Sequence, residues 1–253
     1  MRITYATEPT PGGVNEDYVV TGPGWVAVLD GATMRPGLDS GCVHGVAWLV
    51  RRLAGELAQR LAVELETPLP DLLADAIKAT CTAHAGTCDL DNPDSPSSTV
   101  AILRAHGGTL DWLALADSPI LLDVGGEIRV ILDDRVAHLP DYSLGAVRVL
   151  RNGPGGFWVA GTLPDAAHEA VTGSVPLADV RRAAVFSDGG SRLTEWFGLL
   201  DWAGLLDLLD REGPAELIRS TRAAEATLTR ERRAVLRGKH HDDATAVLVS
   251  FGT

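Results

Sequence analysis

The order of the apolar segments constrains the fold of this chain more than any other feature. Strand-like runs such as Trp25–Leu29 fill the segment that ends at Asp30. Two helical segments follow, then a group of strands, a second pair of helices and a last strand at Ala244–Phe251. Strict βαβ alternation is missing. The order predicts an α+β fold, a four-layer α-β-β-α sandwich in which two antiparallel sheets stack face to face between helix pairs.

The spacing of the apolar side chains predicts where the individual helices and strands lie. From Val43 to Leu65 they recur at three- and four-residue spacing, which predicts an amphipathic helix. Asp71 is a candidate cap for a second helix running towards Cys88. Short apolar runs separated by glycine and proline turns then predict an antiparallel meander of Thr99–Leu103, Leu110–Leu115, Ile120–Val124 and Ile128–Leu132. A strand at Ala183–Phe186 and helices at Asp201–Leu209 and Pro214–Leu236 complete the prediction.

No change of composition marks a domain boundary, so we expect one domain over residues 1–253. The stretch from Asp133 to Asp179 fits the pattern least well. It contains a short strand candidate at Phe157–Val159 and a short helix candidate at Pro164–Ala170. We interpret it as a surface insertion near the functional site.

Charge and hydropathy limit the partners. The formal net charge of −12 disfavours nucleic acid and anionic membrane surfaces, so neither is expected as a partner. The sequence has no apolar stretch of signal-peptide or membrane-spanning length. We therefore expect a cytoplasmic protein.

The three cysteines are Cys42, Cys81 and Cys88. Their number is odd and no Cys-x-x-Cys occurs, which argues against a disulfide framework or a zinc site. We expect reduced, half-buried cysteines.

Aspartates stand at the ends of apolar strands. Asp30 and Asp188 follow such runs directly, Asp117 follows a third, and Asp242-Asp243 precedes the last strand. Carboxylate oxygens at rigid strand ends suit Mg²⁺ or Mn²⁺. Any one aspartate also fits a helix cap or turn.

Convergence of these carboxylates requires cations. Two bare carboxylates about 4 Å apart repel each other by roughly 4 kcal/mol at an effective dielectric constant near 20. Two divalent cations reverse the sign of this interaction, activate a water molecule and hold a phosphoryl group between them. The sequence therefore predicts a phosphate-ester hydrolase.

Six short motifs carry a resemblance to a known family. In chain order they are Asn15-Glu16-Asp17, Asp30-Gly31-Ala32, Ser97-Ser98-Thr99-Val100, Ala116-Asp117-Ser118, Ser187-Asp188-Gly189 and Asp242-Asp243-Ala244-Thr245. In this order and at these separations they resemble the metal-dependent serine/threonine protein phosphatases of type 2C, the PPM family, in its bacterial form. The resemblance covers nearly the whole chain.

The resemblance implies a β-sandwich flanked by helices, with two Mn²⁺ or Mg²⁺ ions at one end and a third, weaker ion beside them. Asp30 would bridge the two ions and the Gly31 carbonyl would bind the second. Asp188 and Asp243 would bind the first. The resemblance also implies that Glu16 and Asp17 hold metal-bound water and that Asp117 binds the third ion. Residues 141–179 would form a flap over the site.

The sequence departs from the family at the phosphate-binding arginine, whose position is Gly12 here. Arg35, Arg148 and Arg151 are candidate replacements. Two further family positions are also changed, to Pro119 and Ala244. The metal site therefore looks intact while phosphate recognition looks altered.

The sequence does not settle the roles of three histidines. His240 and His241 are candidate proton donors or solvated loop residues, and His44 opens the long helix near the site.

Three functions remain in competition. A phosphoserine/phosphothreonine protein phosphatase is the leading hypothesis. The missing arginine also fits a non-catalytic phosphatase-like binding module or a phosphatase of small phosphomonoesters.

Overall fold

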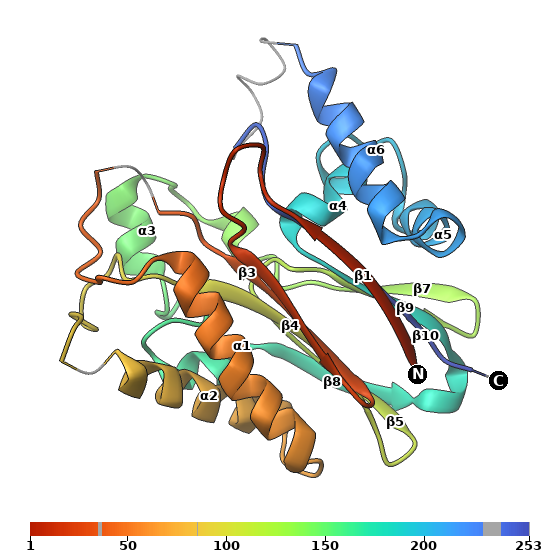
Figure 1. Cartoon of the computed structure of the whole chain (residues 1–253), viewed down its shortest axis with the longest axis horizontal. Coiled ribbons are helices and arrows are strands. Elements are labelled where there is room, and N and C mark those ends of the chain that lie inside the picture. Colours follow the sequence, from red (N-terminus) through yellow and green to blue (C-terminus); the bar gives the residue numbers. More distant parts are fainter. Residues whose placement is uncertain (35–36, 85, 230–238, 253) are drawn as a thin grey trace.

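The computed structural model describes residues 1–34, 37–84, 86–229 and 239–252. Two five-stranded antiparallel sheets stack on each other, with strand orders β1-β10-β9-β6-β7 and β2-β3-β4-β5-β8 (Figure 1). The first sheet comprises β1 (Arg2–Glu8), β10 (Ala244–Ser250), β9 (Val180–Phe186), β6 (Ile120–Val124) and β7 (Glu127–Ile131). The second comprises β2 (Asp17–Gly22), β3 (Trp25–Gly31), β4 (Ser98–His106), β5 (Thr109–Leu115) and β8 (Val171–Pro176). The predicted α+β class and the two stacked antiparallel sheets are confirmed.

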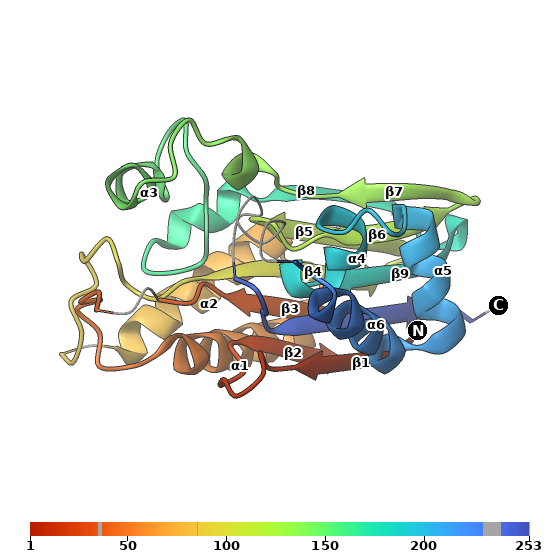
Figure 2. The ribbon, with the colours of Figure 1, turned by 90° about the horizontal axis from the view of Figure 1, so that it is seen from above.

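Helices cover the outer faces of both sheets (Figure 1). The second sheet is covered by α1 (Val46–Val63) and α2 (Leu69–Ala83), and the first by α4 (Asp188–Glu195), α5 (Trp202–Glu212) and α6 (Pro214–Ala226). The short helix α3 (Leu144–Leu150) lies beyond the strand ends (Figure 2). Three 3₁₀ turns span Arg135–His138, Pro164–Glu169 and Leu177–Asp179. No helix in the described part of the chain is both long and apolar enough to cross a membrane.

Strand β3 shows why the strands are apolar on both faces. Successive side chains on a strand point to opposite faces of its sheet. Val26 and Val28 belong to the core between the sheets, whereas Ala27 and Leu29 pack in the cluster that includes α1 and α2. Every residue from Trp25 to Leu29 is buried, so both sides of the strand contribute apolar contact.

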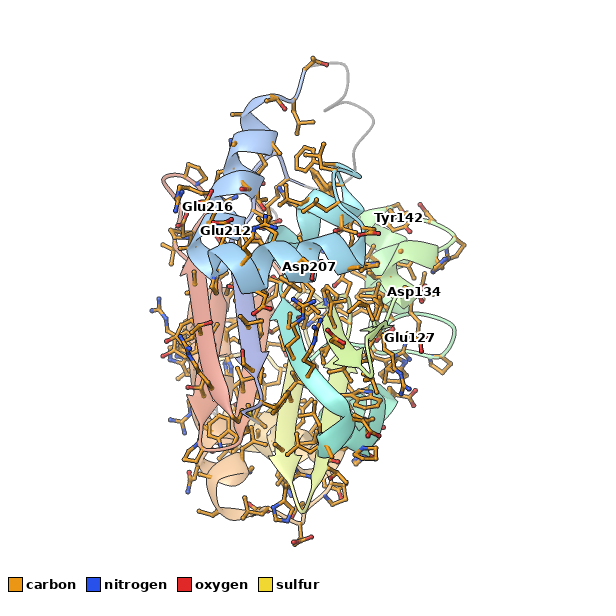
Figure 3. All side chains as sticks on the ribbon, turned by 90° about the vertical axis from the view of Figure 1, so that its right-hand side faces the viewer. Glu127, Asp134, Tyr142, Asp207, Glu212 and Glu216 are labelled. Carbon is orange, nitrogen blue, oxygen red and sulfur yellow. The ribbon has the colours of Figure 1, made fainter. Side chains whose placement is uncertain are left out.

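An ion-pair network fixes α5 on the first sheet. Arg182 of β9 contacts Asp123 of β6 at 3.1 Å, Asp207 at 2.5 Å and Asp210 at 2.9 Å. Asp207 and Asp210 belong to α5, and Figure 3 shows Asp207 on this helix. The same network holds α5 over the strand that leads into Asp188.

The predicted meander is wrong in its connectivity. Strands β4 and β5 form one hairpin and β6 and β7 another, but the two hairpins belong to different sheets. The chain crosses between the sheets after β5, where Ala116 has a φ of 64°. Turn residues predict each hairpin locally, whereas the pairing of β5 with β8 and of β6 with β9 depends on distant segments.

Other elements differ from the predicted boundaries. Helix α2 ends at Ala83, and Asp71 lies in its first turn without capping it. Helix α4 was not predicted, because Gly189 and Gly190 disfavour a helix. Part of the predicted insertion is the strand β8. The predicted strand at Phe157–Val159 is reduced to one isolated bridge, between Phe157 and Arg151. The end of the predicted helix near Leu236 lies outside the described residues.

Candidate metal centre

Three strand ends and one helix start meet at one end of the sandwich. Asp30, near the end of β3, pairs in register with Asp17 on β2 and Thr99 on β4. Asp188 is the first residue of α4, and its backbone N–H donates to the Asp30 carboxylate at 3.2 Å. The fold therefore places aspartates from distant parts of the chain in contact.

These residues line a pocket of about 280 Å³. Four of its lining side chains are the carboxylates of Asp30, Asp117, Asp188 and Asp242. Its remaining lining residues are Gly31, Ala32, Thr33, Thr99, Ala116, Val136, Phe157, Val159 and Lys239. Phe157 and Val159 come from the stretch predicted as an insertion near the site, and they do border it.

The pocket concentrates negative charge. Burial, followed by repulsion from Asp17 and Asp188, raises the pKa of Asp30 well above its usual value. Burial, followed by repulsion from Asp188, raises the pKa of Asp117 to about 7. The pKa of Asp188 is raised by burial and by Asp242.

Beside the pocket, Asp17 is 3% exposed and its pKa is raised to about 7, chiefly by burial. One of its carboxylate oxygens accepts from the Thr245 hydroxyl at 2.7 Å, and the other is buried without a partner. An acceptor oxygen that lacks a donor, next to a pocket of carboxylates, fits divalent cations with oxygen ligands. This donor set suits Mn²⁺ or Mg²⁺.

Asp242 and Asp243, of which the sequence favoured Asp243 as a ligand, lie in different surroundings. Both oxygens of Asp243 accept backbone N–H bonds at 2.6 Å, from Thr10 and Glu16, and its side chain does not line the pocket. Asp242 lines the pocket, where it accepts from Lys239 Nζ at 2.6 Å and from Arg192 at 3.3 Å. Asp243 therefore shapes the connection between β1 and β2, while its neighbour faces the other acids.

The glycines beside the aspartates serve chain packing. A Cβ on Gly189 would lie 1.9 Å from the Asp243 carbonyl oxygen, and one on Gly31 would lie 2.3 Å from the Val46 side chain. Gly31 itself lines the pocket. The carboxylate of Glu16 accepts from the Thr33 hydroxyl.

Two of the three predicted phosphate-binding arginines, Arg148 and Arg151, do not line the pocket. Arg148 forms an ion pair with Asp94, and Arg151 donates to the Pro93 carbonyl at 3.0 Å. Arg35 lies outside the described residues. The one cationic side chain among the described lining residues is Lys239, which sequence reasoning missed. Its position three residues before Asp242 was the available signal.

The histidines beside Asp242 also face elsewhere. The Nδ1 atom of His241 lies 2.6 Å from the buried carboxylate of Glu225, and its ring stacks on His240 at 3.9 Å. Neither histidine lines the acidic pocket.

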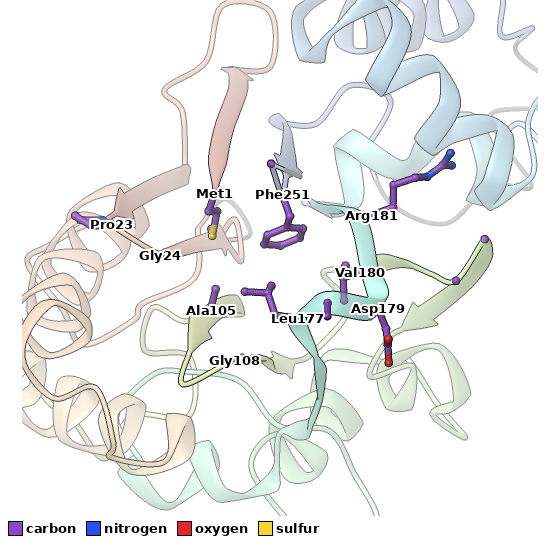
Figure 4. A pocket seen from close by; sticks show the side chains of 14 residues that line it. Met1, Pro23, Gly24, Ala105, Gly108, Leu177, Asp179, Val180, Arg181 and Phe251 are labelled. Atoms are coloured by element: carbon purple, nitrogen blue, oxygen red, sulfur yellow. The ribbon is translucent and has the colours of Figure 1, made fainter.

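A larger hollow of about 1220 Å³ lies at the opposite end of the strands, beside the turn that precedes β3 (Figure 4). Met1, Leu177 and Phe251 line it, and its charged side chains are Asp179 and Arg181 (Figure 4). Its described lining residues include no group of carboxylates. The aspartates gather at the Asp30 end instead.

A helix-flanked antiparallel β-sandwich with aspartates gathered at one end is the arrangement that the resemblance to the metal-dependent phosphatases implied. The family model described as Protein phosphatase 2C matches residues 11–219, and the chain belongs to this family of metal-dependent serine/threonine protein phosphatases. The predicted family, fold and activity class are confirmed.

Solved structures show the same fold. The Mycobacterium tuberculosis serine/threonine phosphatase PstP/Ppp is 19% identical with a TM-score of 0.61, over 100% of this chain and 99% of that one. The catalytic domain of PstP in complex with 2 manganese ions is 21% identical with a TM-score of 0.59, over 98% and 97%. Stp1 from Staphylococcus aureus is 14% identical with a TM-score of 0.62, over 99% and 95%. No match was found among curated protein sequences.

Proposed function

We propose that residues 1–253 act as one phosphatase domain that binds two Mn²⁺ or Mg²⁺ ions in the acidic pocket and hydrolyses phosphoserine or phosphothreonine in proteins. The observation that carries the proposal is the convergence of Asp30, Asp117, Asp188 and Asp242 on one pocket of about 280 Å³. When bound there, the ions would lower the pKa of water and polarise the phosphoryl group. The two manganese ions of the PstP catalytic domain support the number proposed.

Asp30 is the residue best placed to bridge the two ions. It is paired with Asp17 across β2 and β3, and it accepts from the backbone N–H of Asp188. Asp188 and Asp242 flank it in the pocket, and we assign to Asp242 the ligand role predicted for Asp243. The Gly31 carbonyl stays a proposed ligand of the second ion.

Two further acids fit supporting roles. The unpartnered oxygen of Asp17 suits acceptance of a proton from water held in the pocket, while Thr245 fixes its other oxygen. Asp117 lines the pocket and remains the candidate ligand of a third ion. Glu16 stays a prediction, because its carboxylate accepts from Thr33 at the rim.

Lys239 is the proposed replacement for the missing arginine. Its ammonium group contacts Thr33 Oγ1 at 2.5 Å and Asp242 at 2.6 Å, at the edge of the pocket. A charge-assisted hydrogen bond to phosphate contributes about 1.5–3 kcal/mol, so Lys239→Gln is expected to raise KM about tenfold or more. The apolar border formed by Val136, Phe157 and Val159 suits a phosphorylated side chain presented by a peptide.

The decisive experiment compares adjacent aspartates. Mn²⁺ binding is measured by calorimetry, and turnover is measured with an aryl phosphate and a phosphothreonine peptide, in Asp242→Asn, Asp243→Asn and the exposed control Asp75→Asn. We expect Asp242→Asn to lose Mn²⁺ affinity and turnover, Asp243→Asn to retain Mn²⁺ binding, and the control to match the wild type. Retained Mn²⁺ binding and turnover in Asp242→Asn would contradict the assignment.

The same assays separate the alternatives. A small-molecule phosphatase would prefer small phosphomonoesters to the phosphopeptide, and a non-catalytic module would turn over neither. The cytoplasmic location remains a prediction from the sequence.

A further inference from the structure

A second group of metal-ligand side chains lies outside the acidic pocket. Cys42, His44, His84 and Cys88, here called the Cys/His cluster, place one ligand atom each within 4.8 Å of one another. Cys42 and His44 precede α1, His84 caps the end of α2, and Cys88 follows it. The three cysteines are free and half-buried, as predicted. Their number and spacing in the sequence argued against a zinc site, yet the structure brings two of them together with two histidines.

We propose that the Cys/His cluster is a structural Cys₂His₂ site for Zn²⁺, separate from the site of phosphate-ester hydrolysis. Two thiolates and two imidazoles are a zinc donor set, and four protein ligands leave no open position for catalysis. The two thiolates would also neutralise the ion, so the site needs no further counter-charge.

Three sulfur–nitrogen distances agree with a tetrahedron around zinc, whereas the sulfur–sulfur distance is shorter. In a tetrahedron, Zn–S and Zn–N bonds of about 2.3 and 2.0 Å give S–N edges of about 3.5 Å and an S–S edge of about 3.8 Å. The Cys42 sulfur lies 3.8 Å from His44 Nδ1 and 3.5 Å from His84 Nδ1, and the Cys88 sulfur lies 3.3 Å from His44 Nδ1. The two sulfur atoms are 3.0 Å apart, so the ion requires a small separation of the cysteines.

The backbone around the ligands is already arranged. Thr87 links the start of the Cys88 segment to His84, because its backbone N–H and its hydroxyl both donate to the His84 carbonyl, at 3.0 and 2.7 Å. Asp89 N–H donates to the Gly41 carbonyl at 2.8 Å, which joins the two ligand-bearing segments directly. The His44 N–H lies 3.4 Å from the Cys42 sulfur, where it stabilises a thiolate.

Trp48 orients both imidazoles. Its ring stacks on His44 with centroids 4.0 Å apart and meets His84 edge-on at 4.5 Å. His84 is 3% exposed, so one side of the cluster is closed to water. Side chains that hold the ligands in place strengthen metal binding.

The position of the cluster gives the site a structural role. It would tie the segment before α1 to the end of α2. Helix α1 begins at Val46, two residues after His44, and Val46 packs against the backbone of Gly31 in the acidic pocket. The ion would therefore fix the start of the helix that supports one wall of the catalytic site. Oxygen donors favour Mn²⁺ or Mg²⁺ and sulfur donors favour Zn²⁺. The acidic pocket and the Cys/His cluster would therefore bind different metals.

The first test is the metal content of the full chain purified under reducing conditions. Mass spectrometry of the metals is expected to give one zinc per chain in the wild type and none in Cys42→Ser or Cys88→Ser. Cys81→Ser is the matched control, because the Cys81 sulfur contacts the Gly161 and Thr162 carbonyls outside the cluster. Zinc retained in Cys88→Ser, or lost equally in Cys81→Ser, would overturn the proposal.

The second test uses Co²⁺ as a spectroscopic probe of the wild-type protein and does not depend on whether the serine variants fold. Tetrahedral cobalt with thiolate ligands is expected to give intense visible d–d bands and a sulfur-to-cobalt charge-transfer band. Asp30→Asn should keep these bands while losing Mn²⁺-dependent turnover, which separates this site from the proposed catalytic one. Spectra of octahedral cobalt alone would refute the zinc site. A protein mass lower by two hydrogens, which a Cys42–Cys88 disulfide would give, would refute it as well.

Discussion

Replacing Asp117 by asparagine is expected to stabilise the protein against unfolding at pH 8 in buffer without Mn²⁺ or Mg²⁺. Burial, followed by repulsion from Asp188, raises the pKa of Asp117 from 3.8 to about 7. At about 1.4 kcal/mol for each tenfold change in acid dissociation, ionised Asp117 costs the folded state at most about 4 kcal/mol. Because Asp117 is partly exposed, solvent screening reduces the expected gain to about 2 kcal/mol.

The sign of the effect follows from proton binding. The pKa is higher in the folded state, so the folded protein binds more protons than the unfolded chain between about pH 4 and pH 7. The penalty is absent below pH 4, grows as the pH rises and is complete above about pH 7. Asp117→Asn should therefore gain less at pH 4.5 than at pH 8.

Urea unfolding followed by circular dichroism checks this prediction, with Asp75→Asn on the exposed face of α2 as the control. With added Mn²⁺ the wild type should become more stable than Asp117→Asn, because the ions stabilise the folded protein by binding the wild-type carboxylate and not the amide. Chelators are omitted so that a zinc ion in the Cys/His cluster stays in place. The electrostatic reasoning would be refuted if Asp117→Asn and Asp75→Asn changed the free energy of unfolding equally at pH 8. It would also be refuted if Asp117→Asn gained as much stability at pH 4.5 as at pH 8.

Two further predictions concern stability. Glu225→Gln removes the buried partner of an arginine at 2.6 Å and should lower the free energy of unfolding by about 3–5 kcal/mol, whereas Glu216→Gln, which is more exposed on the same helix, should change it by less than about 1 kcal/mol. Denaturant titration measures both. Gly189→Ala should reduce the melting temperature and turnover, because its Cβ would lie 1.9 Å from the Asp243 carbonyl oxygen, while Gly55→Ala in open space on α1 should stabilise by about 0.5–1 kcal/mol. Wild-type behaviour of the first glycine variant would show that the backbone contact is not tight.

Local patterns predicted the elements better than their partners. The apolar pattern located α1 and the runs Ile120–Val124 and Trp25–Leu29. A helix with one buried stripe and a strand with two buried faces each produce a pattern of apolar residues within a short stretch of sequence. This pattern did not predict that β5 and β6 lie in different sheets. It also missed α4, whose two glycines are required by close contact with the start of β10.

The sequence by itself determined that aspartates end the apolar strands, that the chain has an α+β order, and that its motifs resemble one family. Only the tertiary structure decided which of two adjacent acids enters the pocket, because neighbouring side chains point in different directions and contacts with Thr10 and Glu16 turn Asp243 away. It also decided that Cys42 and Cys88 meet, since their separation along the chain carries no information about helices α1 and α2 packing side by side. Chemistry at both sites depends on the distances between atoms, and packing of distant segments sets those distances.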